Sequence, residues 1–536
     1  MTKQSHGGKM GLTLLAALSL ATWARATEQL NVSEVELILA QAITYASRVD
    51  PTAVIAVVDR EGFVLGAWDV RGGAAPPSDG LIAGAVSRAG TAAFLSSDQD
   101  AFTSRTAGFI IQQHFPPGVR NTPPGPLVGV GFSNLFYSDV NRLKKIPPNF
   151  DPFALTNPFQ SPGARTDGVP LSSLNDSPGG VPLYKNGQLV GGIGVTGDGH
   201  PTDLSAAAAI LARQTQRTAT PGFVPGHDTD EDVALAGQTG FRPADEILAS
   251  NVLINGIRIP YVDAAPADIP SARDVQPLGT IGNVIAGYEV HGSPTIYPYR
   301  PATLGGVDGE IRQPIRSDPL PGTIGKASRL SASEVESILT LAAQRCSITR
   351  AGIRLPLGVR AQTFIAVVNN PHKNGVAPSV LGCFRVGEAT LFSWDVAVQK
   401  ARTAVFFSNK QLAMSCRAVG FLSQRNFPPG LDGRTWGPLF GFQEAVSLKT
   451  APITHKFPGN SNLPSGLTIF PGGFPLYRNG ELVGAIGVSG DGVDQDDIIC
   501  ASGCADFLPL DRIRADHFTY RGARLPYAKF PRDPQE

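Results

Sequence analysis

The chain has 536 residues, with 45 basic and 45 acidic side chains and a formal net charge of zero. This balance argues against a nucleic acid or an anionic membrane as a partner recruited by bulk charge. Charged residues make up 17% of the chain and apolar residues 42%, alongside 60 glycines and 45 prolines. We therefore expect compact domains with long, irregular surface loops, and not a disordered chain.

Residues 1–26 have the pattern of a cleavable secretory signal. Two lysines precede a short apolar run at 11–23, and Ala24-Arg25-Ala26 fits an A-x-A cleavage site. The apolar run is too short to span a bilayer. We expect a mature chain that starts near Thr27, is periplasmic or secreted, and has no stable membrane insertion after cleavage.

The rest of the chain carries one module twice. Residues 178–199 recur almost unchanged at 471–492, and residues 85–118 recur at 397–430. Self-similarity of this length indicates two copies of one structural unit. We divide the chain into module 1 (27–261), a Pro/Gly-rich linker (262–328) and module 2 (329–536). A duplicated module supplies its own partner, so we expect an intrachain pseudo-dimer, with homo-oligomers also possible.

Each module predicts the same elements in the same order. Capping boxes at Ser33-x-x-Glu36 and Ser333-x-x-Glu336 open a first helix. In module 1, two strands at 54–58 and 63–68 follow, then Ala-rich helices at 83–95 and 101–114. A hairpin around Asn186-Gly187 comes next, and a last helix begins at Asp230 in module 1 and at Asp496 in module 2. The fold class is α/β (α+β): two tandem domains, each an antiparallel meander sheet flanked by helices.

The second strand of the hairpin is rich in glycine. Gly192-x-Gly194-x-x-Gly197 fits the dinucleotide fingerprint, but that fingerprint needs a strand-to-helix turn in a βαβ unit. Here the glycines lie on the return strand of a hairpin, so we expect close approach of a backbone or a ligand instead. Ligand specificity is expected from the insertions at 134–177 in module 1 and around 348–362 in module 2.

Three motifs resemble a known family: IAVVDREGFVLGAW, AVQKARTAVFF and GGFPLYRNGELVGAIGVSGDGVDQD. They are similar to the HbpS/GlcG-type haem-binding (haem-degrading) family. The resemblance implies an antiparallel sheet flanked by helices, a tendency to oligomerise, and binding of haem or its iron, in some members with haem-degrading activity. Members of the family are usually single modules, so a duplicated chain departs from the norm.

Haem needs an apolar slot and cations for its propionates, and it usually takes an axial donor. Module 2 offers two cations on its Ala-rich helix, whereas module 1 has Gly90 in place of the second, so we favour module 2. Repeated Tyr and Asp residues of the hairpin block join the candidates, although a packed strand residue and a turn former are the plainer interpretations. Solvated helix charges are the alternative for the cations. The candidate binding residues are Lys400, Arg402, Thr403, Arg417, Arg88, Thr91, Tyr477 and Asp491.

Neither an iron ligand nor a catalytic residue can be assigned. No histidine occupies the same position in both modules, and His114 aligns with Asn426, as a helix-end residue would. All five cysteines lie in module 2, so the shared chemistry does not need thiols; an oxidising compartment would permit disulfides, with one thiol left over. We expect an exported protein that binds haem or a similar small apolar acid. An enzyme acting on haem or small organic acids, or a non-catalytic structural pseudo-dimer, are the alternatives.

Overall fold

The computed structural model describes residues 28–73, 75–112, 114–128, 143–146, 168–169, 172–197, 227–263, 274–294, 300–356, 358–424, 426–440 and 467–529. The predicted signal peptide, most of the insertion at 134–177 and Asp198 lie outside these residues. Within the described part, no helix combines the length and the apolar character needed to cross a membrane.

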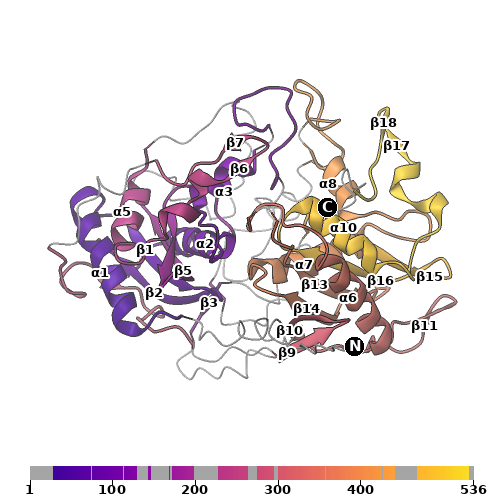
Figure 1. Ribbon diagram of the computed structural model, residues 1–536, viewed down its shortest axis with the longest axis horizontal. Helices are drawn as coiled ribbons and strands as arrows, with labels where there is room; N and C mark the ends of the chain where they lie inside the picture. Colours follow the sequence, from indigo (N-terminus) through magenta and orange to yellow (C-terminus); the bar gives the residue numbers. More distant parts are fainter. Residues whose placement is uncertain are drawn as a thin grey trace, which may run out of the picture.

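The two modules have the same elements in the same order (Figure 1). Module 1 comprises α1 (Val32–Val49), β1 (Val54–Asp59), β2 (Phe63–Asp69), α2 (Asp79–Leu95), α3 (Ser104–Ile110), β4 (Gly180–Lys185), β5 (Gln188–Thr196) and α5 (Thr229–Gly237). Module 2 comprises α6 (Ala332–Cys346), β13 (Phe364–Asn369), β14 (Val380–Val386), α7 (Phe392–Phe406), α8 (Cys416–Leu422), β15 (Gly473–Arg478), β16 (Glu481–Ser489) and α10 (Val493–Gly503).

Each module also ends in matching short elements. These are the 3-10 turns η4 (Asp245–Ile247) and η5 (Ala249–Asn251) and the hairpin β6 (Leu253–Ile254) and β7 (Ile257–Arg258) in module 1. Their counterparts are η7 (Asp511–Ile513), η8 (Ala515–His517), β17 (Thr519–Tyr520) and β18 (Ala523–Arg524).

The strands of both modules form antiparallel sheets, as predicted, except that the short strand β3 (Lys144–Lys145) pairs with β2 in parallel. The sheet of module 1 has the order β3-β2-β1-β5-β4, and the core of the module 2 sheet repeats it as β15-β16-β13-β14. The two hairpins of a module therefore join through β1 and β5, and the strands do not follow chain order from edge to edge as in a simple meander. The reason is that the chain from β2 to β4 crosses the face of the sheet and places α2 there.

The segment between the modules contributes strands to both sheets. In module 1, β8 (Asn283–Val284) pairs with β2, next to the short parallel strand β3 (Lys144–Lys145). In module 2, β9 (Arg300–Leu304) and β10 (Val307–Gln313) form a hairpin that pairs with β14. The small hairpin β11 (Thr323–Ile324) and β12 (Ala327–Ser328) follows. The Pro/Gly-rich composition predicts an extended linker along the surface, and short edge strands are compatible with it because they need only a few residues with free backbone groups.

The starting points of several helices differ from the prediction. The N-caps of the first helices are Asn31 and Ser331, paired in capping boxes with Glu34 and Glu334. The predicted boxes start two residues later, because the pattern fits twice in this short stretch. The helix predicted from residue 101 begins at Ser104, where Thr103 is the N-cap.

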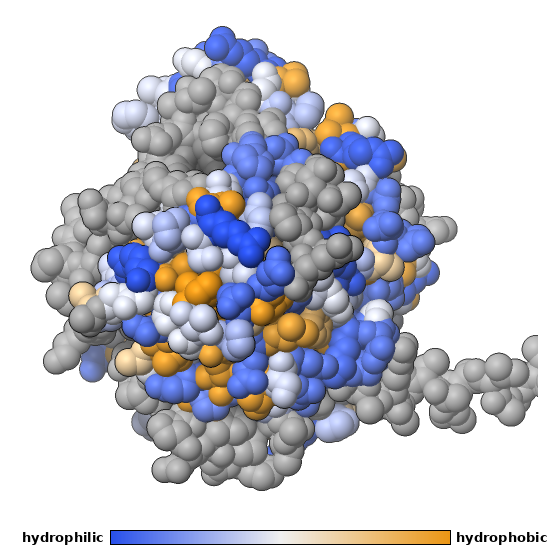
Figure 2. Space-filling view, turned by 90° about the vertical axis from the view of Figure 1, so that its left-hand side faces the viewer, coloured by the Kyte–Doolittle hydropathy of each residue, from blue (hydrophilic) through white to orange (hydrophobic). Residues whose placement is uncertain are grey.

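The sheet of module 1 is buried on both faces. Alternate residues of β1 point to opposite faces: Ile55 and Val57 join a core with α1 and α5, whereas Val54 and Ala56 join the core under α2. The core under α2 continues into module 2. In Figure 1, α1 and α5 accordingly lie on the outer side of module 1, and α2 faces the orange and yellow module 2. Figure 2 views that outer side, where apolar residues form small groups separated by hydrophilic ones.

Glycines on the return strand allow the long helix to pack closely against the sheet. The sequence predicted the close approach of a backbone or a ligand at these glycines. A Cβ on Gly194 would overlap Ala85 O of α2, and one on Gly487 would overlap Ala397 O of α7. Both glycines pair across the sheet with the central strand. The partner that approaches is therefore the helix backbone. The Asn-Gly turns also form as predicted, with positive φ at Asn186 and Asn479.

Candidate functional site

Lys400 is the centre of a buried ion pair. Its side chain is 0% exposed; its ammonium donates to Val488 O at 2.8 Å and to Asp496 Oδ2 at 2.8 Å. The contacts join α7, β16 and the first turn of α10. Burial raises the pKa of Asp496 to about 7, although the Lys400 charge opposes the rise.

Module 1 has the same arrangement with arginine as the cation. Arg88 of α2 contacts Val195 O of β5, and its guanidinium lies 2.5 Å from Asp230 Oδ2 of α5. Arg88 is 1% exposed. These cations are not solvated helix charges: both are buried between the long helix, the sheet and the last helix of the module.

The second predicted cation of module 2 points elsewhere. Arg402 donates from Nε to Pro378 O at 3.0 Å, in the loop before β14. Residues two apart on a helix do not share a face, so the structure does not bring Lys400 and Arg402 to one point. The predicted threonines hold backbone: Thr403 Oγ1 accepts from Thr468 N at 3.0 Å, and Thr91 Oγ1 accepts from Asn175 N at 2.8 Å.

Arg417 and its counterpart Arg105 tie the short helix to the last helix of each module. Arg417 donates to Asp497 Oδ2 at 2.7 Å and to Asp494 Oδ1 at 2.6 Å. Arg105 donates to Glu231 Oε1 at 2.8 Å. Burial alone would raise the pKa of Asp494, but Arg417 lowers it below its usual value. Arg417 and Arg105 thus each form ion pairs with acidic residues of their own module.

The repeated Tyr and Asp residues are buried as well. Tyr477 is packed in β15, and its hydroxyl donates to Asn409 O at 2.8 Å. Asp491 accepts from Gln362 N at 2.7 Å, and its Oδ1 lies 3.5 Å from Arg354 Nε. Burial raises the pKa of Asp491 to about 6, although Arg354 opposes the rise. Asp491 therefore does more than form a turn, because it faces a buried guanidinium.

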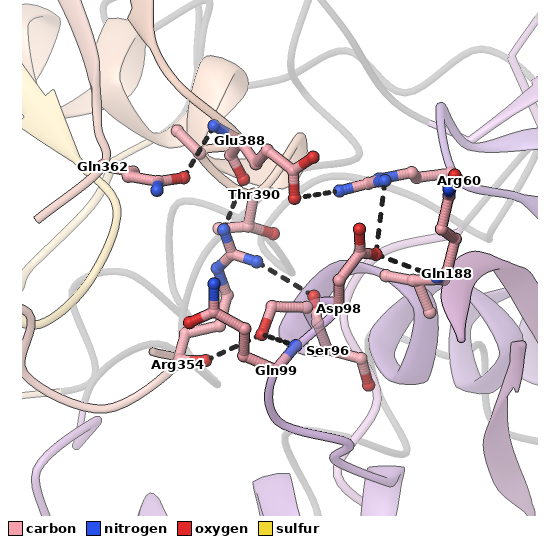
Figure 3. Close-up of polar contacts among 12 residues, drawn as sticks. Arg60, Ser96, Asp98, Gln99, Gln188, Arg354, Gln362, Glu388 and Thr390 are labelled. Atoms are coloured by element: carbon pink, nitrogen blue, oxygen red, sulfur yellow. Dashed lines mark hydrogen bonds and ion pairs between the residues drawn. The ribbon is translucent and has the colours of Figure 1, made fainter. Parts of the chain in front are cut away.

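Arg354 connects the two modules, and the sequence analysis did not single it out. Its Nη1 donates to Ser96 O at 3.0 Å, and its backbone O accepts from Ser97 Oγ at 3.2 Å (Figure 3). It comes from the insertion at 348–362, from which ligand specificity was expected. That location was the one signal for it.

Other polar contacts surround Arg354 at the module boundary. Arg60 of module 1 lies 2.8 Å from Glu388 Oε2 and 3.6 Å from Asp98 Oδ1 (Figure 3). Thr390 Oγ1 donates to Phe94 O, and the rings of Phe94 and Phe392 lie 6.4 Å apart. The two modules are thus in direct contact within the chain.

A small cavity lies at this boundary. Module 1 contributes apolar side chains such as Leu95, Phe102 and Leu127, while module 2 contributes Arg354 and Asp496. The space measures about 20 Å³, room for about one water molecule. Asp496 Oδ1 is buried and has no hydrogen-bond partner among the described residues, and Arg354 Nε lies 3.5 Å from the Asp491 carboxylate. The cavity therefore places one acid and one cation beside an apolar wall.

Metal ligands and thiols give no further site in the described residues. No group of three or more His, Cys, Asp or Glu side chains there could hold a metal ion. All five cysteines are in the described part, and they are buried and free. His114 follows α3, as a helix-end residue, and its Nε2 lies 2.6 Å from Asp432 Oδ1 of module 2.

Fold and site define a tandem α/β protein in which each module buries a cation–carboxylate pair. The model of the family described as haem-degrading protein HbpS-like matches residues 30–212 and 363–505. The chain belongs to this family, in two tandem copies, and the family supports a haem-related small-molecule ligand.

Solved structures also match the chain. The PduOC–haem complex is 22% identical and covers 33% of this chain and 94% of its own, with a TM-score of 0.23. Klebsiella pneumoniae ORFY is 18% identical and covers 34% and 94%, with a TM-score of 0.23. A double mutant of Streptomyces reticuli HbpS is 20% identical and covers 35% and 96%, with a TM-score of 0.21. A search of curated proteins finds no match.

Proposed function

We propose that the protein binds haem, or a similar flat apolar acid, at the cavity between the modules. The observation that carries the proposal is the Arg354 side chain and the Asp496 Oδ1 atom, which has no hydrogen-bond partner among the described residues, beside an apolar wall. Membership of the HbpS-like family supports haem as the ligand. A propionate would meet the Arg354 guanidinium, and the ring would lie against side chains such as Phe102 and Phe392.

The residues around the cavity match the charge and polarity of haem, but the cavity is too small to hold it. Pockets for ligands of this kind span roughly 300–1,000 Å³, and this cavity is about 20 Å³. Binding therefore requires the contact between the modules to open. The affinity is then reduced by the fraction of molecules that are open. The oxygen-bearing side chains at the wall include Thr390, Ser489 and Asp496.

Hemin titration followed by the Soret band tests this proposal. Arg354→Gln should weaken hemin binding by about tenfold to a hundredfold, the effect of one desolvated charge-assisted hydrogen bond. Arg60→Gln is the matched control, because Arg60 lies at the same boundary and does not line the cavity. It should change the affinity less than about threefold, the effect of a partly exposed ion pair. Equal affinities for wild type and Arg354→Gln would refute the assignment.

An enzymatic role is the second candidate, and it is favoured by two carboxyl groups whose pKa is raised toward neutral pH. Burial raises the pKa of Asp100 to about 7, against the opposing charge of Arg354, and raises that of Asp496 likewise to about 7. Carboxyl groups of this kind can take up and release a proton near neutral pH. Turnover of bound hemin, followed as loss of the Soret band, should be slower in Asp496→Asn if that group moves a proton. A rate equal to that of the wild type would leave binding as the function.

We also propose that the chain is exported through residues 1–26. The basic start, the short apolar run and the A-x-A sequence support this. N-terminal sequencing of protein recovered from the periplasm or medium should begin near Thr27. An intact Met1 on protein found only in the cytoplasm would refute export.

A further inference from the structure

A second and larger pocket is lined by residues of module 2 alone and shares none of them with the cavity at the module boundary. Its volume is about 450 Å³, within the range of small-molecule sites. Phe421 of α8, Phe474 of β15 and Tyr527 form aromatic walls, and Ala501 of α10 and its C-cap residue Cys504 form part of the inner surface. The rings of Phe474 and Tyr527 meet edge to face at 5.3 Å. Most of the outer wall comes from residues 508–528, beyond the end of the family match at residue 505.

Module 1 shows why this space exists in module 2. At the equivalent positions it has Leu235 for Ala501, Gln238 for Cys504 and Val262 for Ala528. All three side chains of module 2 are smaller. In module 1, Gln238 is 1% exposed and donates to Pro182 O at 2.6 Å and to Tyr261 Oη at 3.1 Å, so its side chain occupies the corresponding space.

The rim of the pocket also differs from the equivalent part of module 1. It carries an apolar residue that an amphipathic ligand could cover. Leu508 stands where module 1 has Arg242, and it is 63% exposed although it is a large apolar residue. Singly exposed leucines are ordinary. This one, however, lies at the edge of an apolar cavity, where a bound molecule would cover it.

Four charged residues stand around the mouth. Arg514 lies 2.7 Å from Asp516 and 2.9 Å from Asp511, and its guanidinium is 5.2 Å from the Tyr527 ring centroid. Arg524 shares Asp516 at 3.4 Å, and its side chain is 70% exposed. A guanidinium has five N–H donors, so Arg524 keeps donors that face solvent. An anionic group at the mouth would meet this arginine.

We propose that this pocket is a second ligand site, for a small molecule with an aromatic or branched apolar body and one anionic group. The body occupies the space bounded by Phe421, Phe474 and Tyr527, and the anion contacts Arg524. The site is separate from the boundary cavity proposed for haem, and it does not depend on that proposal.

The test uses 8-anilinonaphthalene-1-sulfonate, an aromatic anion whose fluorescence rises in apolar surroundings. One saturable site is expected on the full-length folded protein. The triple variant Ala501→Leu, Cys504→Gln, Ala528→Val gives module 2 the residues of module 1 and should abolish this binding. Circular dichroism and the thermal midpoint establish that the variant is folded.

Two single substitutions of exposed residues test the proposal if the triple variant does not fold. Arg524→Gln removes an exposed charge and should weaken probe binding by about two- to fivefold. Arg258→Gln, at the equivalent position of module 1, should leave it unchanged. Binding that persists in the folded triple variant, or equal affinities in Arg524→Gln and Arg258→Gln, would overturn the proposal. Displacement of the probe by one equivalent of hemin would also overturn it, because the pocket would then be the haem site.

Discussion

Removing the charge of Lys400 should destabilise module 2 substantially. The ammonium is 0% exposed and lies 2.8 Å from an Asp496 carboxylate whose side chain is 3% exposed. Removing one partner of a buried pair leaves the other charge without compensation, which costs about 3–5 kcal/mol. For a module of about 200 residues this corresponds to a fall of roughly 6 to 20 °C in the midpoint. The sequence analysis left solvated helix charges as the alternative, and the loss of such a charge would leave stability nearly intact; the burial of Lys400 excludes that alternative.

The assay is thermal unfolding of Lys400→Met, with Lys400→Arg as the matched control. Arginine fills the equivalent position of module 1 as Arg88, where it contacts the same two kinds of group. Lys400→Arg should therefore cost about 1 kcal/mol, the change in shape without loss of charge. The double variant Lys400→Met, Asp496→Asn should recover part of the loss, because no buried charge is then left unpaired.

The pH dependence gives an independent check on the same pair. Burial raises the folded-state pKa of Asp496 to about 7, above its ordinary value of 3.8, with Lys400 opposing. A carboxyl group with a raised pKa makes the folded protein more stable at low pH, and this contribution to stability is lost as pH rises through 7. The cost of Lys400→Met should thus be smaller at pH 5 than at pH 8, since Asp496 can take up a proton. Equal midpoints for wild type and Lys400→Met at pH 8 would refute the reasoning.

Three more outcomes are expected. Gly472→Ala should cost more than Gly480→Ala in chemical unfolding: its Cβ would lie 2.8 Å from Asp496 Cβ, whereas at Gly480 the nearest atom is 3.8 Å away. Asp491→Asn should flatten the dependence of the thermal midpoint on pH between 4 and 7, because burial raises the pKa of Asp491 to about 6 against the charge of Arg354. Hemin affinity should rise as pH falls from 8 to 6 and lose this dependence in Asp496→Asn, since a carboxylate at the cavity repels a propionate.

Local patterns predicted the local structure well. The Asn-Gly turns and the glycines of the return strand lie where the sequence placed them, because both depend on residues a few positions apart. The Ala-rich helix was also found, although α2 starts at Asp79 and not at residue 83. Its N-cap, Ser78, is an ordinary cap residue that an earlier start of the pattern would have included.

The environment of the candidate cations could not be predicted in the same way. A helix with one solvent-exposed face would be expected to carry Lys400 or Arg88 on that face, as an exposed charge. Both helices instead lie between their own sheet and the other module, so charged residues on them are buried and need partners. Arg354 was missed because its contact with Ser96 joins residues 258 positions apart. A one-dimensional pattern carries no information on such a contact.

Comparison of the modules separates scaffold from specificity. The buried pairs at Arg88 and Lys400 occur in both modules and join the same three elements, so they belong to the framework of the fold. Arg354 and the small residues around Cys504 occur in module 2 alone, and each borders a space that a ligand could fill. Function that is particular to this chain should therefore follow the positions where its copies differ. Substitutions that make module 2 like module 1 should remove ligand binding before they disturb the fold.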